Sequence, residues 1–279
     1  MKYSLRAEED YLKDLSARIE RAKNADSPAS SLGQWIGALV SKGTTLVLRD
    51  ILKGYSDYSL MKPDKGKKRT TLINIRGQNK EIDDVIVNGD NEPVIISESK
   101  WLKDARHLND KGAWVALLPE VKQANETVKG AISILAGPWD AGNNIEALGK
   151  VVRVVPITIK EVYRLLSEHG IDIEINEERN TYLHPKETLA DLLTFFQSKA
   201  KSKVDAISSL GLELVEPHKN LIKTAIDEIL ALPEAVDMID SSTINEIEVI
   251  YKTKEGLKIR EVYKDAKELI KAIKKHFFL

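Results

Sequence analysis

The chain has no cysteine among its 279 residues, and it also lacks long apolar runs. Without cysteine there is no disulfide, no thiolate zinc site and no thiol nucleophile. No uninterrupted run of about 18 apolar residues occurs, so no membrane-spanning helix is expected. The first residues lack the apolar centre of a signal peptide. We therefore expect a cytoplasmic protein with no membrane partner.

The chain also has no large excess of either charge, because its 42 Lys and Arg nearly balance its 43 Asp and Glu. The local distribution is uneven: residues 61–80 hold seven basic residues and one acid, whereas residues 224–251 hold seven acids and no Lys or Arg. The basic stretch could meet a phosphate backbone, although such a run alone is equally typical of a solvated loop. The candidates for phosphate contacts are Lys65, Lys67, Lys68, Arg69, Arg76 and Lys80.

Apolar periodicity predicts a mixed α/β part followed by a mainly helical part. In the first part we expect helices over 3–23, 31–52, 159–168 and most of 104–128, and strands over 71–75, 81–87, 94–100, 131–136 and 151–157. In the second part we expect helices over 185–206, 217–232 and 264–277, with one strand over 244–251. A helix before a run of strands, with helices between the later strands, predicts an α/β core whose mixed central sheet is flanked by helices.

Two neighbouring apolar runs carry acids and a lysine. The run Glu81 to Val87 contains two adjacent aspartates, and the run Val94 to Lys100 ends in Glu98-Ser99-Lys100. Residues 88–91 read Asn-Gly-Asp-Asn, which is typical of a hairpin turn. A carboxylate on a buried strand is costly unless it is paired or bound to a cation. The two runs therefore predict a hairpin with a functional site.

Alternation along the strands predicts which of these side chains meet. Residues two apart in a strand face the same way, so Asp83 shares a face with Glu81, and Glu98 shares a face with Lys100. If the strands are adjacent, Asp83, Glu98 and Lys100 converge. One or two carboxylates with water and a substrate phosphate are typical ligands of Mg²⁺. Such a site suits hydrolysis of a phosphodiester, with Lys100 orienting water or stabilising charge.

Asp83, followed after fourteen residues by Glu98-Ser99-Lys100 at the end of an apolar strand, resembles the PD-(D/E)XK nuclease superfamily. The similarity extends over about residues 30–165 and covers the preceding helix, the hairpin, the helix after Lys100 and the strand over 131–136. It implies a restriction-endonuclease-like core, Mg²⁺-dependent cleavage of double-stranded DNA and Mn²⁺ as a substitute cation. It also implies that Asp83 and Glu98 bind the metal and that Lys100 is the catalytic lysine, with Asp84 and Glu81 as further possible metal ligands.

The resemblance leads us to expect three regions. These are an N-terminal helical segment over 1–30, a catalytic core over 31–180 and a mainly helical region for recognition or dimerisation over 181–279. A type II restriction enzyme acting as a homodimer is the favoured hypothesis, since two-fold symmetry matches a palindromic target. A DNA repair or junction-resolving nuclease, an inactive nucleic-acid-binding protein and an acidic interaction module are the alternatives.

Two departures from the family pattern stand out. The residue before Asp83 is isoleucine, not proline, and the helix over 31–52 has no acid before Asp50. Glu20 and Asp50 are weak candidates for the acid that many members carry on this helix. Pro63-Asp64 matches the literal motif but lies in the basic loop. A bulge in the first strand would exchange Asp83 for Asp84, because a one-residue slip reverses the faces.

Overall fold

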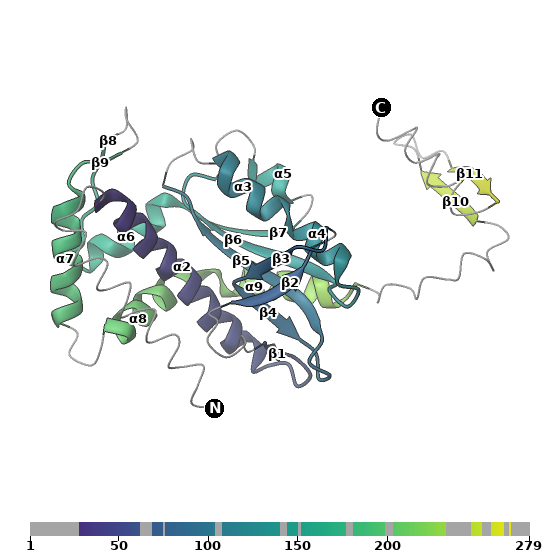
Figure 1. Cartoon of the computed structure of the whole chain (residues 1–279), viewed down its shortest axis with the longest axis horizontal. Coiled ribbons are helices and arrows are strands. Elements are labelled where there is room, and N and C mark those ends of the chain that lie inside the picture. The colour runs from purple at the N-terminus through teal and green to yellow at the C-terminus, as the bar shows by residue number, and fades with distance from the viewer. Residues whose placement is uncertain are drawn as a thin grey trace. The chain divides into compact units, whose positions relative to one another are not determined.

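A computed structural model describes residues 28–61, 69–74, 76–103, 108–139, 144–149, 152–176, 181–198, 203–232, 247–252, 258–264 and 268 (Figure 1). The chain divides into two compact units, Met1–Leu232 and Pro233–Leu279. Within the described ranges, no helix combines the length and the apolarity needed to cross a membrane.

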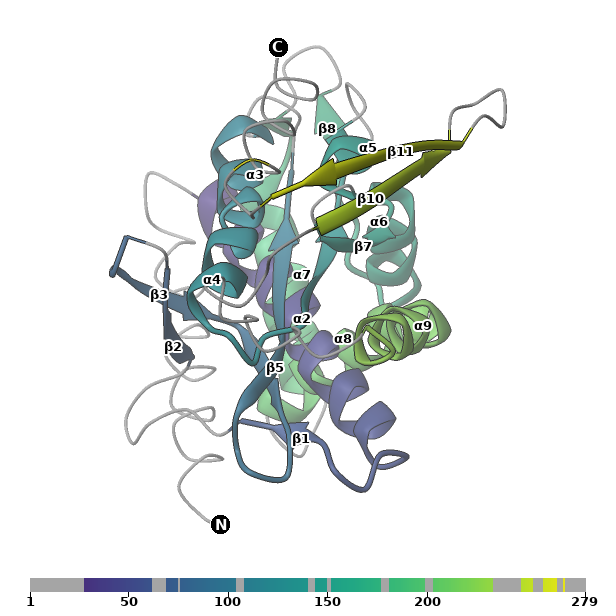
Figure 2. The same cartoon turned by 90° about the vertical axis from the view of Figure 1, so that its right-hand side faces the viewer.

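The first unit is built on a five-stranded mixed sheet (Figure 2). Its strands in spatial order are β1 Ser59–Leu60, β4 Asp84–Val87, β5 Pro93–Trp101, β6 Gly130–Ala136 and β7 Arg153–Ile157. The pairs β1–β4 and β4–β5 are antiparallel, whereas β5–β6 and β6–β7 are parallel. The hairpin and the two later strands expected from the sequence are therefore present, and the mixed α/β class is confirmed.

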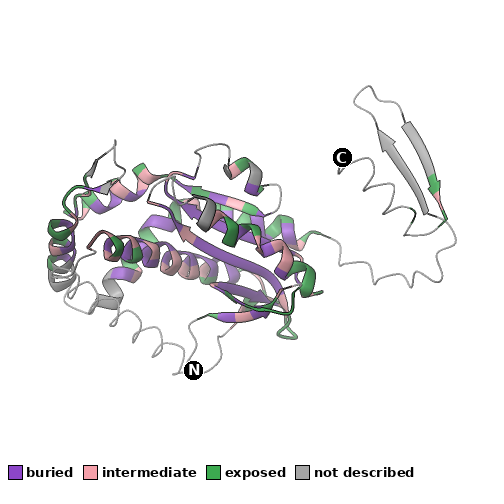
Figure 3. Cartoon of the chain, turned by 45° about the horizontal axis from the view of Figure 1, so that its top comes forward, coloured by how far each residue is buried: buried purple, intermediate pink, exposed green. Residues whose placement is uncertain are grey.

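One face of the sheet is covered by a long helix, α2 Pro28–Leu52, which packs against β5 and α8. The apolar residues of α2 repeat at helical spacing, and Pro28 suits the first turn because its missing N–H has no helical partner there. Trp35, Leu39 and Leu48 of this helix are fully buried. Buried residues extend along the helices and strands of the first unit (Figure 3). Their core also takes in Ile95 and Ile132 of the sheet.

The opposite face of the sheet is covered by shorter helices. They are α3 Leu108–Ala116, α4 Leu118–Ala124 and α5 Asn144–Gly149. Their buried residues pack with alternate residues of the same strands, such as Val85, Ile96 and Leu135. Because β5 and β6 are buried on both faces, β6 and the first half of β5 read as nearly continuous apolar runs in the sequence.

The remaining helices extend the first core. They are α6 Ile159–Glu168, α7 Pro185–Ser198, α8 Lys203–Val215 and α9 Lys219–Leu230, with a 3₁₀ turn η3 Glu216–His218 before α9. Thr158 caps α6 in a capping box with Glu161. The helices α7 and α8 pack on α2, and the first compact unit extends to Leu232.

Three two-stranded ladders complete the described structure. They are β2 Thr70–Ile73 with β3 Asn79–Ile82, β8 Ile175–Asn176 with β9 Thr181–Tyr182, and β10 Ile247–Lys252 with β11 Lys258–Tyr263. The last pair belongs to the second unit and contains the strand expected over 244–251. The helices expected over 3–23 and 264–277 lie outside the described residues, apart from Lys264 and Glu268.

Asp50 at the end of α2 is held by two lysines. Lys219 of α9 binds its carboxylate, as does Lys53 with an Nζ–Oδ1 distance of 2.9 Å. The hydrogen bond from Lys219, with a smaller one from Lys53, lowers the pKa of Asp50 to about 2. These contacts are exposed, so their contribution to stability is small.

We expect Asp50→Asn to lower the stability of the protein above pH 4 and to have no effect near pH 2. A depressed pKa means that folding favours the carboxylate, so its stabilisation is present above the unfolded value of 3.8 and is lost as the pH falls toward about 2. Urea midpoints of both proteins across this range measure the difference. A difference that stays constant down to pH 2 would contradict the assignment.

Candidate nuclease site

Strand β5 carries two of the expected site residues, Glu98 and Lys100, near its end. The register pairs Asp84 of β4 with Ser97 and Val85 with Ile96. Paired residues share a face, and every second residue of β5 shares one too. Glu98 and Lys100 therefore lie on the face of Ile96 and Val85, which is covered by α3 and α4. Ser97 and Asp84 lie on the face covered by α2.

Asp83 occupies a bend between β3 and β4, so the single strand expected over 81–87 is divided at this residue. Its Oδ2 accepts a hydrogen bond from the backbone N–H of Ser99 at 3.0 Å and lies 3.9 Å from Lys100 Nζ. Its Oδ1 forms a close ion pair with Arg69 Nε at 2.6 Å. Only 3% of the Asp83 side chain is exposed, so these cations are needed to offset its burial.

Glu98 is equally buried, with 2% of its side chain exposed, and its carboxylate accepts a hydrogen bond from Lys100. Burial raises the pKa of Glu98, the negative charge of Asp83 raises it further, and Lys100 opposes both effects. Lys100 Nζ thus lies between two buried carboxylates. The structure brings together Asp83, Glu98 and Lys100, as strand alternation predicted.

Asp84, the alternative to Asp83, lies on the opposite face of the sheet. Its two carboxylate oxygens accept hydrogen bonds from Thr45 Oγ1 of α2, at 2.9 and 3.1 Å. The two neighbouring aspartates therefore lie on opposite faces of the sheet: Asp83 faces Lys100, and Asp84 faces the long helix α2. A bulge occurs in β4, but it lies between Ile86 and Val87, after both aspartates, and does not exchange their faces.

Asp50 of α2 is not an acid of the site, because its carboxylate binds Lys53 and Lys219. Glu20 lies outside the described residues, as does Asp64. Thr45 of α2 donates to the carboxylate of Asp84, on the other face of the sheet. Sequence reasoning missed this contact, because a threonine within an amphipathic helix carries no signal of it.

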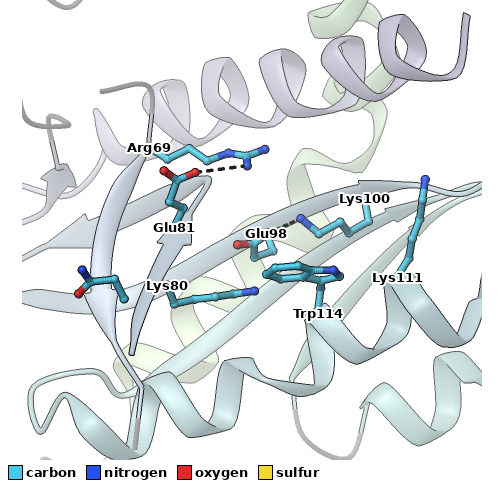
Figure 4. A pocket seen from close by; sticks show the side chains of 8 residues that line it. Arg69, Lys80, Glu81, Glu98, Lys100, Lys111 and Trp114 are labelled. Atoms are coloured by element: carbon cyan, nitrogen blue, oxygen red, sulfur yellow. Dashed lines mark hydrogen bonds and ion pairs between the residues drawn. The ribbon is translucent and has the colours of Figure 1, made fainter. Parts of the chain in front are cut away.

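A pocket of about 450 Å³ opens in front of Glu98 and Lys100 (Figure 4). Its other lining residues are Arg69, Asn79, Lys80, Glu81, Lys111 and Trp114. Lys80 extends from β3 and Trp114 from α3, so the pocket lies between the small ladder and the helical layer. Two carboxylates and four cationic side chains line it, which gives the pocket a net positive charge and favours anions.

Burial lowers the pKa of two of these lysines. Lys80 is 6% exposed, and desolvation outweighs the attraction of Glu98. Lys111 donates a hydrogen bond to the carbonyl of Trp101, and its pKa is lowered first by burial and then by the charge of Lys100. A bound anion would offset these costs, because an opposite charge favours the protonated form.

The remaining candidates for phosphate contacts are distributed differently. Arg69 bridges Asp83 at 2.6 Å and the exposed Glu81 at 3.9 Å, and Glu81 also lines the pocket. Arg76 is exposed and forms an ion pair with Glu120, with an Nη2–Oε1 distance of 3.5 Å. Lys65, Lys67 and Lys68 lie outside the described residues.

The carboxylate pair suits a divalent cation of the kind expected. Mg²⁺ is usually held by one or two carboxylates, with water and phosphate oxygens completing the shell. No cluster of three or more acids and histidines able to hold a metal occurs in the described part of the chain, so Asp83 and Glu98 would be its protein ligands. Ser133, the register partner of Glu98 on β6, has a buried hydroxyl that finds no hydrogen-bond partner among the residues that the structure describes. This hydroxyl could bind a water of such a shell.

Comparison of the chain with known protein families, with curated proteins and with solved structures finds no match. The assignment to the PD-(D/E)XK superfamily therefore stays a prediction from residues 83–100 and their geometry.

Proposed function

We propose that this chain is a Mg²⁺-dependent endonuclease that hydrolyses phosphodiester bonds in DNA, with a PD-(D/E)XK site. One observation carries the proposal: at the edge of a basic pocket, Lys100 Nζ contacts two buried carboxylates, Asp83 in the bend before β4 and Glu98 on β5. Buried charges of this kind cost free energy. A functional role explains why the chain retains them, and the pairing of their charges explains how the fold tolerates them.

Each residue of the group has a role in this proposal. Asp83 and Glu98 bind the cation, and the backbone N–H of Ser99 fixes the orientation of the Asp83 carboxylate. When bound, Mg²⁺ or its substitute Mn²⁺ polarises the phosphate and lowers the pKa of a bound water. Lys100 would then be free to direct its ammonium group at the attacking water or at a phosphoryl oxygen.

The basic side chains around the site support a nucleic-acid substrate. Lys80, Arg69 and Lys111 add positive charge beside the carboxylates, where a phosphate backbone would approach. Within this class we favour a sequence-specific type II restriction enzyme that acts as a homodimer on double-stranded DNA. A repair or junction-resolving nuclease would use the same catalytic residues, and an inactive DNA-binding protein would keep Lys100 on Glu98 permanently.

The test is incubation of the full chain with supercoiled plasmid in Mg²⁺, in Mn²⁺ and in EDTA. We expect cleavage in both cations and none in EDTA, with discrete bands if the enzyme recognises a sequence. A smear would favour a nonspecific or structure-directed nuclease. DNA binding that weakens with salt but leaves the plasmid intact would identify the inactive binding protein. The absence of both binding and cleavage would contradict the proposal.

A further inference from the structure

Trp114 and Lys80 form a pair at the pocket that metal binding and hydrolysis leave unexplained. Lys80 Nζ lies 3.6 Å from the centroid of the Trp114 ring, a typical cation–π distance. The lysine comes from β3 and the tryptophan from α3, so two elements far apart in the sequence build the pair (Figure 4). Both residues line the same pocket as Glu98 and Lys100.

Lys80 is a buried cation with incomplete partners. The residue is 6% exposed, and its Nζ has no hydrogen-bond partner among the described residues. An ammonium group has three donors, and burial without partners is costly. The Trp114 ring and the charge of Glu98 offset part of this cost. Oxygen acceptors of an anion in the pocket would use the donors that remain.

Trp114 is an exposed aromatic in a protein that otherwise buries its tryptophans. It is 53% exposed, whereas Trp35, Trp101 and Trp139 are at most 4% exposed. Lys80 covers one face of the indole, so exposed ring surface remains for a second planar group. Nucleic-acid bases stack on such rings whatever their sequence.

We propose that this pocket receives one nucleotide displaced from its base stack, with its phosphate on Lys80 and its base on the free surface of Trp114. The inference rests on the proposed nuclease function and specifies its substrate class. The volume of about 450 Å³ is within the range of roughly 300–1,000 Å³ that small ligands occupy. A stacked and paired base cannot reach a tryptophan in such a pocket, but an unpaired base can. DNA with unpaired nucleotides is therefore preferred over intact duplex, which favours the repair or junction-resolving nuclease over the type II restriction enzyme.

The test measures binding in EDTA, so that it does not depend on cleavage. Fluorescence anisotropy compares a labelled oligothymidylate of about twelve nucleotides, a typical site size for single strands, with a fully paired hairpin. We expect the single strand to bind more tightly. Trp114→Ala should weaken its binding by about tenfold, as is common for loss of a stacking ring, and Lys80→Met should weaken it too. Trp114→Phe and Lys80→Arg should restore most of the affinity.

Lys186→Met is the matched control for charge, because Lys186 is an exposed lysine on α7 outside the pocket. It should bind the single strand as the unaltered protein does. Quenching of tryptophan fluorescence by unlabelled oligothymidylate gives a second readout, which Trp114→Phe should largely abolish.

Equal affinity for hairpin and single strand, or unchanged binding by both Trp114→Ala and Lys80→Met, would overturn the nucleotide pocket. Metal-dependent cleavage could still be observed in that case. Conversely, selective single-strand binding without any cleavage would support the pocket and contradict the nuclease function.

Discussion

Lys100→Met is expected to reduce the rate of Mg²⁺-dependent DNA cleavage by at least about 100-fold, the effect typical of removing a group that stabilises charge in a transition state. Lys100 Nζ contacts both Glu98 and Asp83, and methionine retains its length without its charge. The two carboxylates remain, so Mg²⁺ still binds. Higher Mg²⁺ concentration should therefore not restore the rate. Single-turnover cleavage across a Mg²⁺ titration measures both effects.

Lys103→Met is the matched control for this substitution. Lys103 follows the end of the same strand, but its Nζ lies 5.1 Å from the ring of Tyr182 and outside the pocket. Its loss should leave cleavage unchanged. A Lys100→Met protein that folds normally and cleaves at the unaltered rate would remove Lys100 from the mechanism.

Gly43→Ala is expected to destabilise the protein by about 1–3 kcal/mol or more, as is usual when atoms are added to a packed core. Gly43 lies on α2 where this helix crosses α8, and an added Cβ would lie 1.9 Å from the carbonyl oxygen of Gly211. Because this neighbour is backbone, relief requires the two helices to move apart. Urea denaturation with the midpoint and slope measured for both proteins tests the effect.

Gly112→Ala provides the comparison, because this glycine lies in α3 and an added Cβ would meet no atom of the described residues within 4 Å. Alanine favours the helix over glycine by about 0.8–1 kcal/mol, so this change should be neutral or stabilising. Equal stability of Gly43→Ala and the unaltered protein would mean that the crossing of α2 and α8 is looser than described.

The geometry of the carboxylate pair could be predicted from the sequence because strand alternation is a local rule. Glu98 and Lys100 are two apart in one apolar run, which places them on one face wherever the strand pairs. Strand alternation alone does not decide between Asp83 and Asp84, because Asp83 lies in a bend between β3 and β4 and not within a strand. The side chain still faces Lys100, since the Ser99 N–H and Arg69 hold it there.

The pocket wall could not be predicted in the same way. Trp114 is 53% exposed, whereas Trp101 and Trp139 are at most 4% exposed, and the residue type alone does not distinguish them. Lys80 was predicted as a phosphate contact of the basic stretch, and nothing in the sequence indicates that its side chain is buried. Its partner ring lies on a helix more than thirty residues away, and no local pattern links a lysine to such a ring.

The extent of the helical part was also underestimated. The sequence predicted helices over 185–206 and 217–232, whereas α8 continues from Lys203 to Val215. Gly211 within this stretch is a weak helix former and favours a break. The helix requires glycine at this position, because the close crossing of α8 with α2 at Gly43 leaves no room for a side chain. Tertiary packing overrides local preference there.

The most direct test of the nuclease site compares Asp83→Asn with Asp84→Asn in cleavage of supercoiled plasmid with Mg²⁺. The two substitutions are chemically identical and adjacent, but only Asp83 faces Lys100, whereas Asp84 accepts hydrogen bonds from Thr45. We predict that Asp83→Asn abolishes cleavage and that Asp84→Asn, once shown to be folded, retains it. Retained cleavage by Asp83→Asn, or loss in Asp84→Asn alone, would contradict the site.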